Sequence, residues 1–356
     1  MASPATAYSG PPKLTLVRAF TEWRIDVPSL ILILLVLAWY LISARKVRRA
    51  GGTWGVGRTF AFIVLGCGFW AIATMAWPGV YESALFYARA TQTVLLVLLA
   101  PLFLAMGKPI TLVIEAYPRI GGPVQRAIRS PVAKVVTFPA ITTLALIAVP
   151  MSMYFTTWYL HFFYSSTVRE FTYLILMAPG LAFFWTLLRV DPVPKQYPYV
   201  VAMWITAAEV VGDAFFGIAI IADTNILAAG HYHAFGYPFG PSLATGQVLG
   251  GGIIWILGDA VGLPFLGVQL IQMMRADKQE AKEIDAELDA RDAAREAARA
   301  AKAGQAAVGA AATSDVDLGP ASLVTVAADD PDDADRPWWE SYSQLTDRFK
   351  GADREQ

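Results

Sequence analysis

The sequence predicts an all-α, polytopic membrane protein with seven transmembrane helices. Two observations carry this prediction. The chain of 356 residues is 56% hydrophobic, against roughly 45–50% in soluble domains, and its mean hydropathy is +0.46. The apolar excess lies before residue 275 and falls into separate stretches, each long enough to cross a bilayer, which takes about 20 mostly apolar residues.

Each predicted span is bounded by charges, by Gly and Pro, or by a polar loop. The seven spans are 27–44, 59–77, 84–106, 135–155, 171–189, 199–222 and 247–274. Together they form one transmembrane domain over 27–274. The last span also carries several glycines, among them Gly251, Gly258 and Gly262, which we interpret as positions where neighbouring helices approach closely.

The distribution of Lys and Arg predicts the orientation of the spans. Loops 78–83 and 223–246 contain no Lys or Arg, and 156–170 contains only Arg169. Because cytoplasmic loops are enriched in basic residues, we expect the N-terminus outside and the C-terminus inside. The loops that we place inside carry Arg45, Lys46, Arg48, Arg49, Arg58, Lys108, Arg119, Arg126, Arg129, Lys134 and Lys195.

The segments on either side of the transmembrane domain differ from it in composition. Residues 1–26 are expected to be an extracytoplasmic segment and not a cleavable signal, because the apolar run that follows them is long enough to span. Residues 275–303 predict a charged cytoplasmic helix without a face to bury. Residues 304–336 are predicted to be a disordered linker, and 337–356 a short aromatic C-terminal segment.

Composition also excludes several classes of function. A net charge of −1 argues against a nucleic-acid surface. The single cysteine, Cys67, permits neither an internal disulfide nor a Cys-based metal cluster. We therefore expect a multi-pass protein of the cell membrane whose surroundings are lipid and other membrane proteins.

Ionisable residues inside the predicted spans are the strongest functional signal, because a charge at the centre of a membrane helix costs on the order of 2.5–3.5 kcal/mol. We expect Arg89 to pair with Asp213 in one polar cluster. One interpretation is a buried ion pair that only sets helix order. The other is a proton or cation pathway, since three carboxylates outnumber one arginine. The cluster consists of Arg89, Gln92, Glu209, Asp213 and Asp259.

A second candidate site consists of thioether and imidazole groups, which are the ligands that Cu(I) prefers. All three histidines fall in loops that we place outside, and an M-x-M pair ends the fourth span. The same residues also suit ordinary apolar filling and the membrane interface. The candidate copper ligands are His161, His231, His233, Met151 and Met153.

Four junction motifs in order resemble the CtaG family of cytochrome c oxidase assembly proteins, most closely its actinobacterial members. They are APLFLAMGKPITLV (100–113), FFWTLLRVDPVP (183–194), DAFFGIAI (213–220) and QVLGGGIIW (247–255). The resemblance covers roughly residues 30–275. It implies a seven-helix membrane protein that helps to deliver copper to the CuB centre of a haem-copper oxidase, without catalytic turnover of its own.

The chain departs from the family at positions where relatives carry histidine. The family's H-M-x-Q-H motif matches Arg89–Thr93, where Gln92 is kept and both histidines are replaced. Asp213 stands where actinobacterial members place a histidine, and Tyr173 matches a further family histidine. These departures predict a factor for copper (CuB) delivery or oxidase maturation that lacks the family's buried copper site. It would act either by binding partners, which are oxidase subunits or other copper-handling proteins, or by handling copper through the outer Met and His residues. The alternatives are a proton or cation transporter and a structural membrane scaffold.

Overall fold

A computed structural model describes residue 8 and residues 10–313 of the chain. These residues fall into two compact units, Met1–Ala281 and a second unit that begins at Lys282, and each unit is described by itself. The aromatic segment predicted over 337–356 lies outside the described residues.

The described residues form helices joined by turns and loops. In chain order these are α1 (Leu16–Thr21), α2 (Val27–Arg49), α3 (Val56–Phe60), the π-helical η1 (Ala61–Cys67), α4 (Gly68–Met75), α5 (Trp77–Tyr81), α6 (Phe86–Val94), the π-helical η2 (Leu95–Leu99), α7 (Ala100–Met106), α8 (Pro109–Ala116), α9 (Pro118–Ile128), α10 (Pro131–Val136), α11 (Pro139–Phe155), α12 (Trp158–Tyr164), α13 (Ser166–Leu188), α14 (Tyr199–Ala222), α15 (Ala229–Phe235) and α16 (Leu243–Thr313).

The predicted spans are found as helices of the required length and hydropathy. Within the described residues, six uninterrupted helical stretches could cross a membrane, and a seventh span results if α11 and α12, which bend by 70° at Thr156–Thr157, count as one. The fold class is confirmed: the protein is an all-helical, multi-pass membrane protein. The stretches are Val27–Arg49, Val56–Tyr81, Phe86–Ala116, Pro139–Tyr164 with its bend, Ser166–Leu188, Tyr199–Ala222 and the first part of α16.

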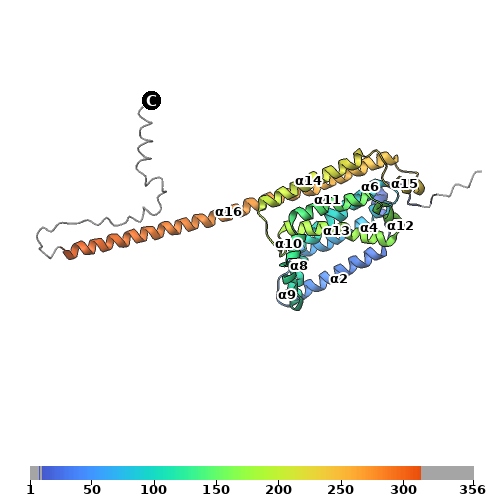
Figure 1. The fold of residues 1–356 in the computed structure, drawn as a ribbon. Helices are drawn as coiled ribbons and strands as arrows, with labels where there is room; N and C mark the ends of the chain where they lie inside the picture. The colour runs from blue at the N-terminus through green and yellow to red at the C-terminus, as the bar shows by residue number, and fades with distance from the viewer. Residues whose placement is uncertain (1–7, 9, 314–356) are drawn as a thin grey trace, which may run out of the picture. The chain divides into compact units, whose positions relative to one another are not determined.

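The spans of the first unit run up and down in one bundle (Figure 1). One end, which we call the aromatic end, consists of residues 76–85, 156–165 and 223–242. The opposite end, which we call the basic end, includes α8, α9 and α10 (Figure 1). Predicted outer loops share the aromatic end and predicted inner loops share the basic end. Which end faces the cytoplasm remains the prediction made from the basic residues.

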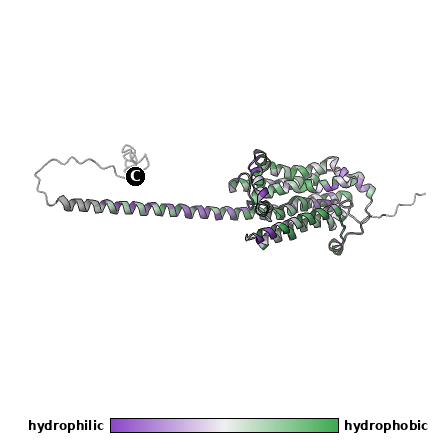
Figure 2. Cartoon of the chain, turned by 90° about the horizontal axis from the view of Figure 1, so that it is seen from below, coloured by the Kyte–Doolittle hydropathy of each residue, from purple (hydrophilic) through white to green (hydrophobic). Residues whose placement is uncertain are grey.

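Large apolar side chains cover the outward faces of the bundle helices. Trp204 is 74% exposed and Val211 is 68% exposed, both on α14, and Figure 2 shows hydrophobic residues along the bundle. Exposure on this scale would be unfavourable in water, but it suits contact with lipid chains.

Glycines bring α14 and α16 together, as the sequence predicts. A β-carbon at Gly217 would lie 2.6 Å from the carbonyl oxygen of Gly251, and a β-carbon at Gly251 would lie 2.6 Å from that of Gly217. Because no side chain fits at either position, the two backbones can approach closely enough for direct packing.

Asp191 ties the basic end together by capping α8. Its carboxylate accepts hydrogen bonds from the backbone N–H of Ile110 at 3.0 Å and of Thr111 at 2.9 Å. These N–H groups belong to the first turn of α8 and have no partner within their own helix. Two prolines stiffen the turn formed by the DPVP motif (191–194). The structure adds that its aspartate joins the third and fifth spans.

The helix at the C-terminal side of the bundle is longer than predicted. The helix α16 continues from the seventh span through the charged segment to Thr313, so neither 275 nor 303 is a helix end. Residues 304–313 are therefore helical, contrary to the predicted start of a disordered linker at 304. Alanine, the best helix former, explains the extension, because it makes up most of 306–312.

Replacing Asp191 by alanine should destabilise the bundle, because two N–H groups of α8 would lose their acceptor in a buried place. Unsatisfied buried groups cost about 1–3 kcal/mol each. We expect a lower melting temperature in detergent for Asp191→Ala. The exposed Glu115→Ala on the same helix should leave the melting temperature unchanged. Equal melting temperatures for the two variants would contradict the capping role.

Candidate functional site

Arg89 is fully buried near the aromatic end, and three different groups hold its guanidinium. One terminal nitrogen donates to the side-chain oxygen of Gln92, one turn further along α6. The other donates to the sulfur of Met153 on α11 at 2.9 Å. The guanidinium carbon lies 3.7 Å from the centre of the Phe162 ring, which places a cation over a π face. None of these three partners is charged.

Gln92 connects Arg89 to a carboxylate. Its amide nitrogen donates to the carbonyl oxygen of Ala73 at 2.9 Å and to Glu82 at 2.8 Å. The hydroxyl of Tyr173 on α13 donates to the same oxygen of Glu82 at 2.7 Å. One glutamine therefore gives its oxygen to a cation and its nitrogen to an anion, which it can do because the amide carries both acceptor and donors.

Glu82 also binds a second arginine. Its other carboxylate oxygen accepts from Arg24 at 2.8 Å, and Glu82 is only 1% exposed, whereas the Arg24 side chain is 37% exposed. Arg24 is positioned by its own backbone, whose N–H donates to the carbonyl of Met75 at 2.8 Å. The result is a line of alternating charges and dipoles from the surface inward, Arg24–Glu82–Gln92–Arg89, which we call the arginine network.

The predicted pairing of Arg89 with Asp213 is wrong. Arg89 contacts α11 and α12, while Asp213 lies on the side of α14 that faces α16, where a β-carbon at Gly258 would overlap its carboxylate. The residue of α14 that faces α11 is Gly212, which packs against Ile147. The two charges therefore have different neighbours, which the depth of each residue along its helix could not reveal.

Glu209, Asp213 and Asp259 form a second polar group at the α14–α16 contact, so the predicted single cluster is in fact two. A β-carbon at Gly262 would lie 3.0 Å from a carboxylate oxygen of Glu209, and Asp259 acts electrostatically on both Glu209 and Asp213. Among the ion pairs of the described residues, none includes these three carboxylates. We call them the carboxylate group. In a low-dielectric place, three adjacent carboxylates can all be ionised only if a cation compensates their charge. Otherwise a proton must neutralise at least one of them.

The candidate copper ligands are engaged in different ways. Met153 is fully buried and its sulfur accepts from Arg89, whereas Met151 is half-buried against the core. His231 is 8% exposed, its Nε2 lies 3.0 Å from the carbonyl oxygen of Ser83, and its ring stacks on Phe163 at 3.7 Å. His161 is exposed, with Nδ1 at 2.7 Å from its own helix's Thr157 carbonyl.

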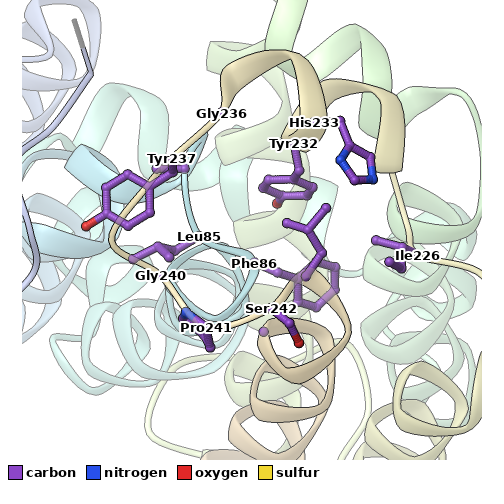
Figure 3. A pocket seen from close by; sticks show the side chains of 13 residues that line it. Leu85, Phe86, Ile226, Tyr232, His233, Gly236, Tyr237, Gly240, Pro241 and Ser242 are labelled. Atoms are coloured by element: carbon purple, nitrogen blue, oxygen red, sulfur yellow. The ribbon is translucent and has the colours of Figure 1, made fainter. Parts of the chain in front are cut away.

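His233 lines a cavity of about 230 Å³ at the aromatic end (Figure 3). Tyr232 and Tyr237 line the same cavity, together with Phe86 of α6. None of the other four candidate copper ligands lines it. In the described part of the chain, no group of three or more His, Cys, Asp or Glu side chains is arranged to hold a metal ion.

Two residues of the arginine network escape sequence reasoning. Glu82 and Arg24 lie outside the predicted spans, so each looks like an ordinary solvated charge. Only the folding of residues 76–85 back into the aromatic end buries Glu82. The sequence gives one signal for them: Arg89 lies inside a span and has no acidic residue on its own helix face, so it needs a partner from elsewhere.

The two polar groups should respond oppositely to the same chemical change. Glu82→Gln removes the carboxylate that Arg24 and Gln92 bind, and we expect a loss between the about 1 kcal/mol of an exposed pair and the about 3–5 kcal/mol of a buried one. Glu209→Gln removes one of three adjacent carboxylates and should leave stability unchanged or raise it. Melting temperatures of both variants in one detergent test this, and a larger loss for Glu209→Gln would contradict it.

Stability should also depend on pH through His231, which lies on α15 outside the spans. Burial lowers the pKa of His231 below its usual 6.5, although the Ser83 carbonyl partly opposes this shift. A depressed folded-state pKa gives stability that is complete above pH 6.5 and is lost as the pH falls through the lowered value. Melting curves between pH 7.5 and roughly pH 5 should show a drop that His231→Phe reduces and His233→Phe does not.

Comparison with known proteins places the chain in a family. The model of the family described as "Cytochrome c oxidase caa3 assembly factor (Caa3_CtaG)" matches residues 38–276. The chain is 28% identical over 286 residues to the "Uncharacterized protein ML1998" of Mycobacterium leprae, covering 77% of this chain and 42% of that protein. It is 27% identical to the "Uncharacterized protein MT0111" of Mycobacterium tuberculosis, covering 78% and 43%.

The chain therefore spans less than half the length of the curated relatives that it matches. No solved structure matches it. The family model covers all seven spans except the first part of α2, and the resemblance expected from the junction motifs is confirmed. This all-helical, multi-pass membrane protein belongs to the caa3-type cytochrome c oxidase assembly factor family, CtaG.

Proposed function

We propose that this protein assists the maturation of a haem-copper oxidase by contacting oxidase subunits in the membrane, and that it does so without a copper site in the interior of its bundle. Membership of the assembly factor family supports the pathway. The arginine network supports the absence of an interior copper site. In this proposal the protein is not an enzyme, and its partners are oxidase subunits or other copper-handling proteins.

The observation that carries the proposal is the environment of Arg89. It stands where the family resemblance places a metal-binding histidine, and its guanidinium is a permanent cation with no acceptor atom. A fixed positive charge repels a copper ion. The guanidinium also donates a hydrogen bond to the sulfur of Met153, the most deeply buried of the candidate ligands, so this sulfur is not free to bind an ion. An ion could enter only if this network opened.

Contact at the aromatic end is the simplest way for such a protein to act. His161 and His233 are exposed there, and the cavity beside His233 is open to a partner. Any copper that the protein handles would then pass over this surface as cargo, with exposed imidazoles as transient ligands.

The carboxylate group supports a second candidate function, proton or cation movement through the bundle. Its motivating observation is that Asp259 has a buried carboxylate oxygen without a hydrogen-bond partner, next to Glu209 and Asp213. A proton flux into liposomes that disappears in Asp259→Asn would support this function. No flux with the unmodified protein would count against it.

A deletion strain tests the primary proposal. We expect loss of the oxidase's haem absorption bands and of its copper content, with restoration by the unmodified gene. The double variant His161→Ala with His233→Ala separates copper handling from assembly by contact alone. Loss of oxidase copper in this variant indicates copper handling by the exposed histidines, and a normal oxidase indicates assembly by contact alone. A deletion strain with a normal oxidase spectrum would overturn the proposed function.

A titration with Cu(I) tests the interior. Under reducing conditions the purified protein should show no tight site that depends on Met153. Met153→Leu removes the buried sulfur, and Met151→Leu is the matched control at a half-buried position on the same helix. Stoichiometric Cu(I) binding that is lost in Met153→Leu and kept in Met151→Leu would contradict an interior without copper.

A further inference from the structure

A small cavity between α2, α4 and α13 combines buried polar groups with an apolar opening. Its volume is about 180 Å³, and it shares no lining residue with the carboxylate group or the cavity beside His233, whereas Tyr173, which donates to Glu82 of the arginine network, is part of its lining. Pockets for drug-sized ligands measure about 300–1,000 Å³, so this one suits a headgroup better than a whole molecule. Its lining includes Ser29, Leu32, Trp70, Glu170, Phe171 and Leu174.

The acidic side of this cavity has a carboxylate oxygen without a hydrogen-bond donor. Ser29 donates to one carboxylate oxygen of Glu170 at 3.1 Å, while the other oxygen of Glu170 is buried without a hydrogen-bond partner. Its nearest cation is Arg169, whose Nε lies 3.5 Å away and is itself without a hydrogen-bond partner. The Glu170 oxygen and the Arg169 Nε therefore form an ion pair without a hydrogen bond.

Asp26 adds a second carboxylate. It occupies the N-cap position of α2, where an aspartate normally accepts from the first turn, yet its side chain makes no capping bond. The residue is 5% exposed, one carboxylate oxygen has no partner, and its charge acts on Glu170. Asp26 does not itself line the cavity and its charge also acts on Arg24, but one of its carboxylate oxygens has no hydrogen-bond donor.

Trp70 is an independent observation on the donor side. It lines the cavity and is 4% exposed, and its indole N–H is buried without an acceptor. A buried Trp N–H usually finds a partner. A metal ion could not accept from it, and a simple anion would be repelled by Asp26 and Glu170. The occupant must carry both a cationic donor and an acceptor oxygen.

We propose that this cavity binds the headgroup of a lipid with a primary ammonium, of the phosphatidylethanolamine class. The ammonium donates to Glu170 and Asp26, and the phosphate or ester oxygens accept from Trp70 and Arg169. The acyl chains lie along Phe171 and Leu174, which are 60% and 40% exposed on the face of α13 that meets lipid. The fold thus offers both the charge pairs of a zwitterionic headgroup and an apolar path for its tails.

Thermal unfolding in nanodiscs of defined composition tests the proposal. The full-length protein is compared in phosphatidylethanolamine, in phosphatidylcholine, whose quaternary ammonium cannot donate a hydrogen bond, and in phosphatidylglycerol, which carries no cation. A bound lipid raises the melting temperature by mass action, so we expect the highest value with phosphatidylethanolamine. Equal melting temperatures in all three lipids would overturn the proposal.

Variants locate the effect. Glu170→Gln and Asp26→Asn should each lower the affinity for phosphatidylethanolamine about ten- to a hundredfold in native mass spectrometry, the scale of one charged hydrogen bond. Glu115→Gln, the same change at an exposed position on α8, should keep the affinity. The melting temperature in phosphatidylglycerol alone shows whether each variant folds. Full retention of the lipid by a folded Glu170→Gln, or equal stabilisation by free phosphoethanolamine, would overturn the proposal.

Discussion

The Glu82 carboxylate is the interaction on which the aromatic end of the bundle depends. Each of its oxygens has a separate task, since one binds Arg24 and the other accepts from Gln92 and Tyr173. Through Gln92 it is also connected to Arg89. A buried guanidinium in a membrane protein is tolerable only with such compensation. The network therefore joins the segment before α2 to α4, α6, α11 and α13.

The basic end has a comparable device with a different chemistry. There a buried carboxylate, Asp191, compensates the backbone of a helix start instead of an arginine. Both carboxylates lie between spans in loops that look unremarkable in the sequence, and both connect helices distant along the chain. One acidic residue thus connects the helices at each end of the bundle, while close glycine contacts and apolar packing stabilise its middle.

The separation of the two buried polar groups shapes what the molecule can do. The arginine network contains more cations than carboxylates, and the carboxylate group contains no cation, yet the described residues show no ion pair between the two groups. A protein selected only for stability would gain by pairing them. Because the two groups keep opposite charges unpaired, a role beyond packing is favoured for each. This is the reason that oxidase maturation and proton movement each have a structural argument.

The sequence by itself determined the fold class, the seven spans, their alternation and the family, because each of these depends on local composition and on the order of short motifs. It also identified the ionisable residues inside the spans, since hydropathy alone shows which charges lie inside apolar stretches. The glycine contacts of α16 were predictable from the spacing of small residues along one span.

Only the tertiary structure decided which of these charges meet. Arg89 and Asp213 lie at compatible depths, but the rotation of each helix about its axis turns one toward α11 and the other toward α16. That rotation is set by packing against several helices at once. The same holds for Glu82, Asp191 and Asp26, whose positions depend on how loops fold back over helix ends. The contacts that distinguish this protein are all between spans, and no local pattern in the chain specifies them.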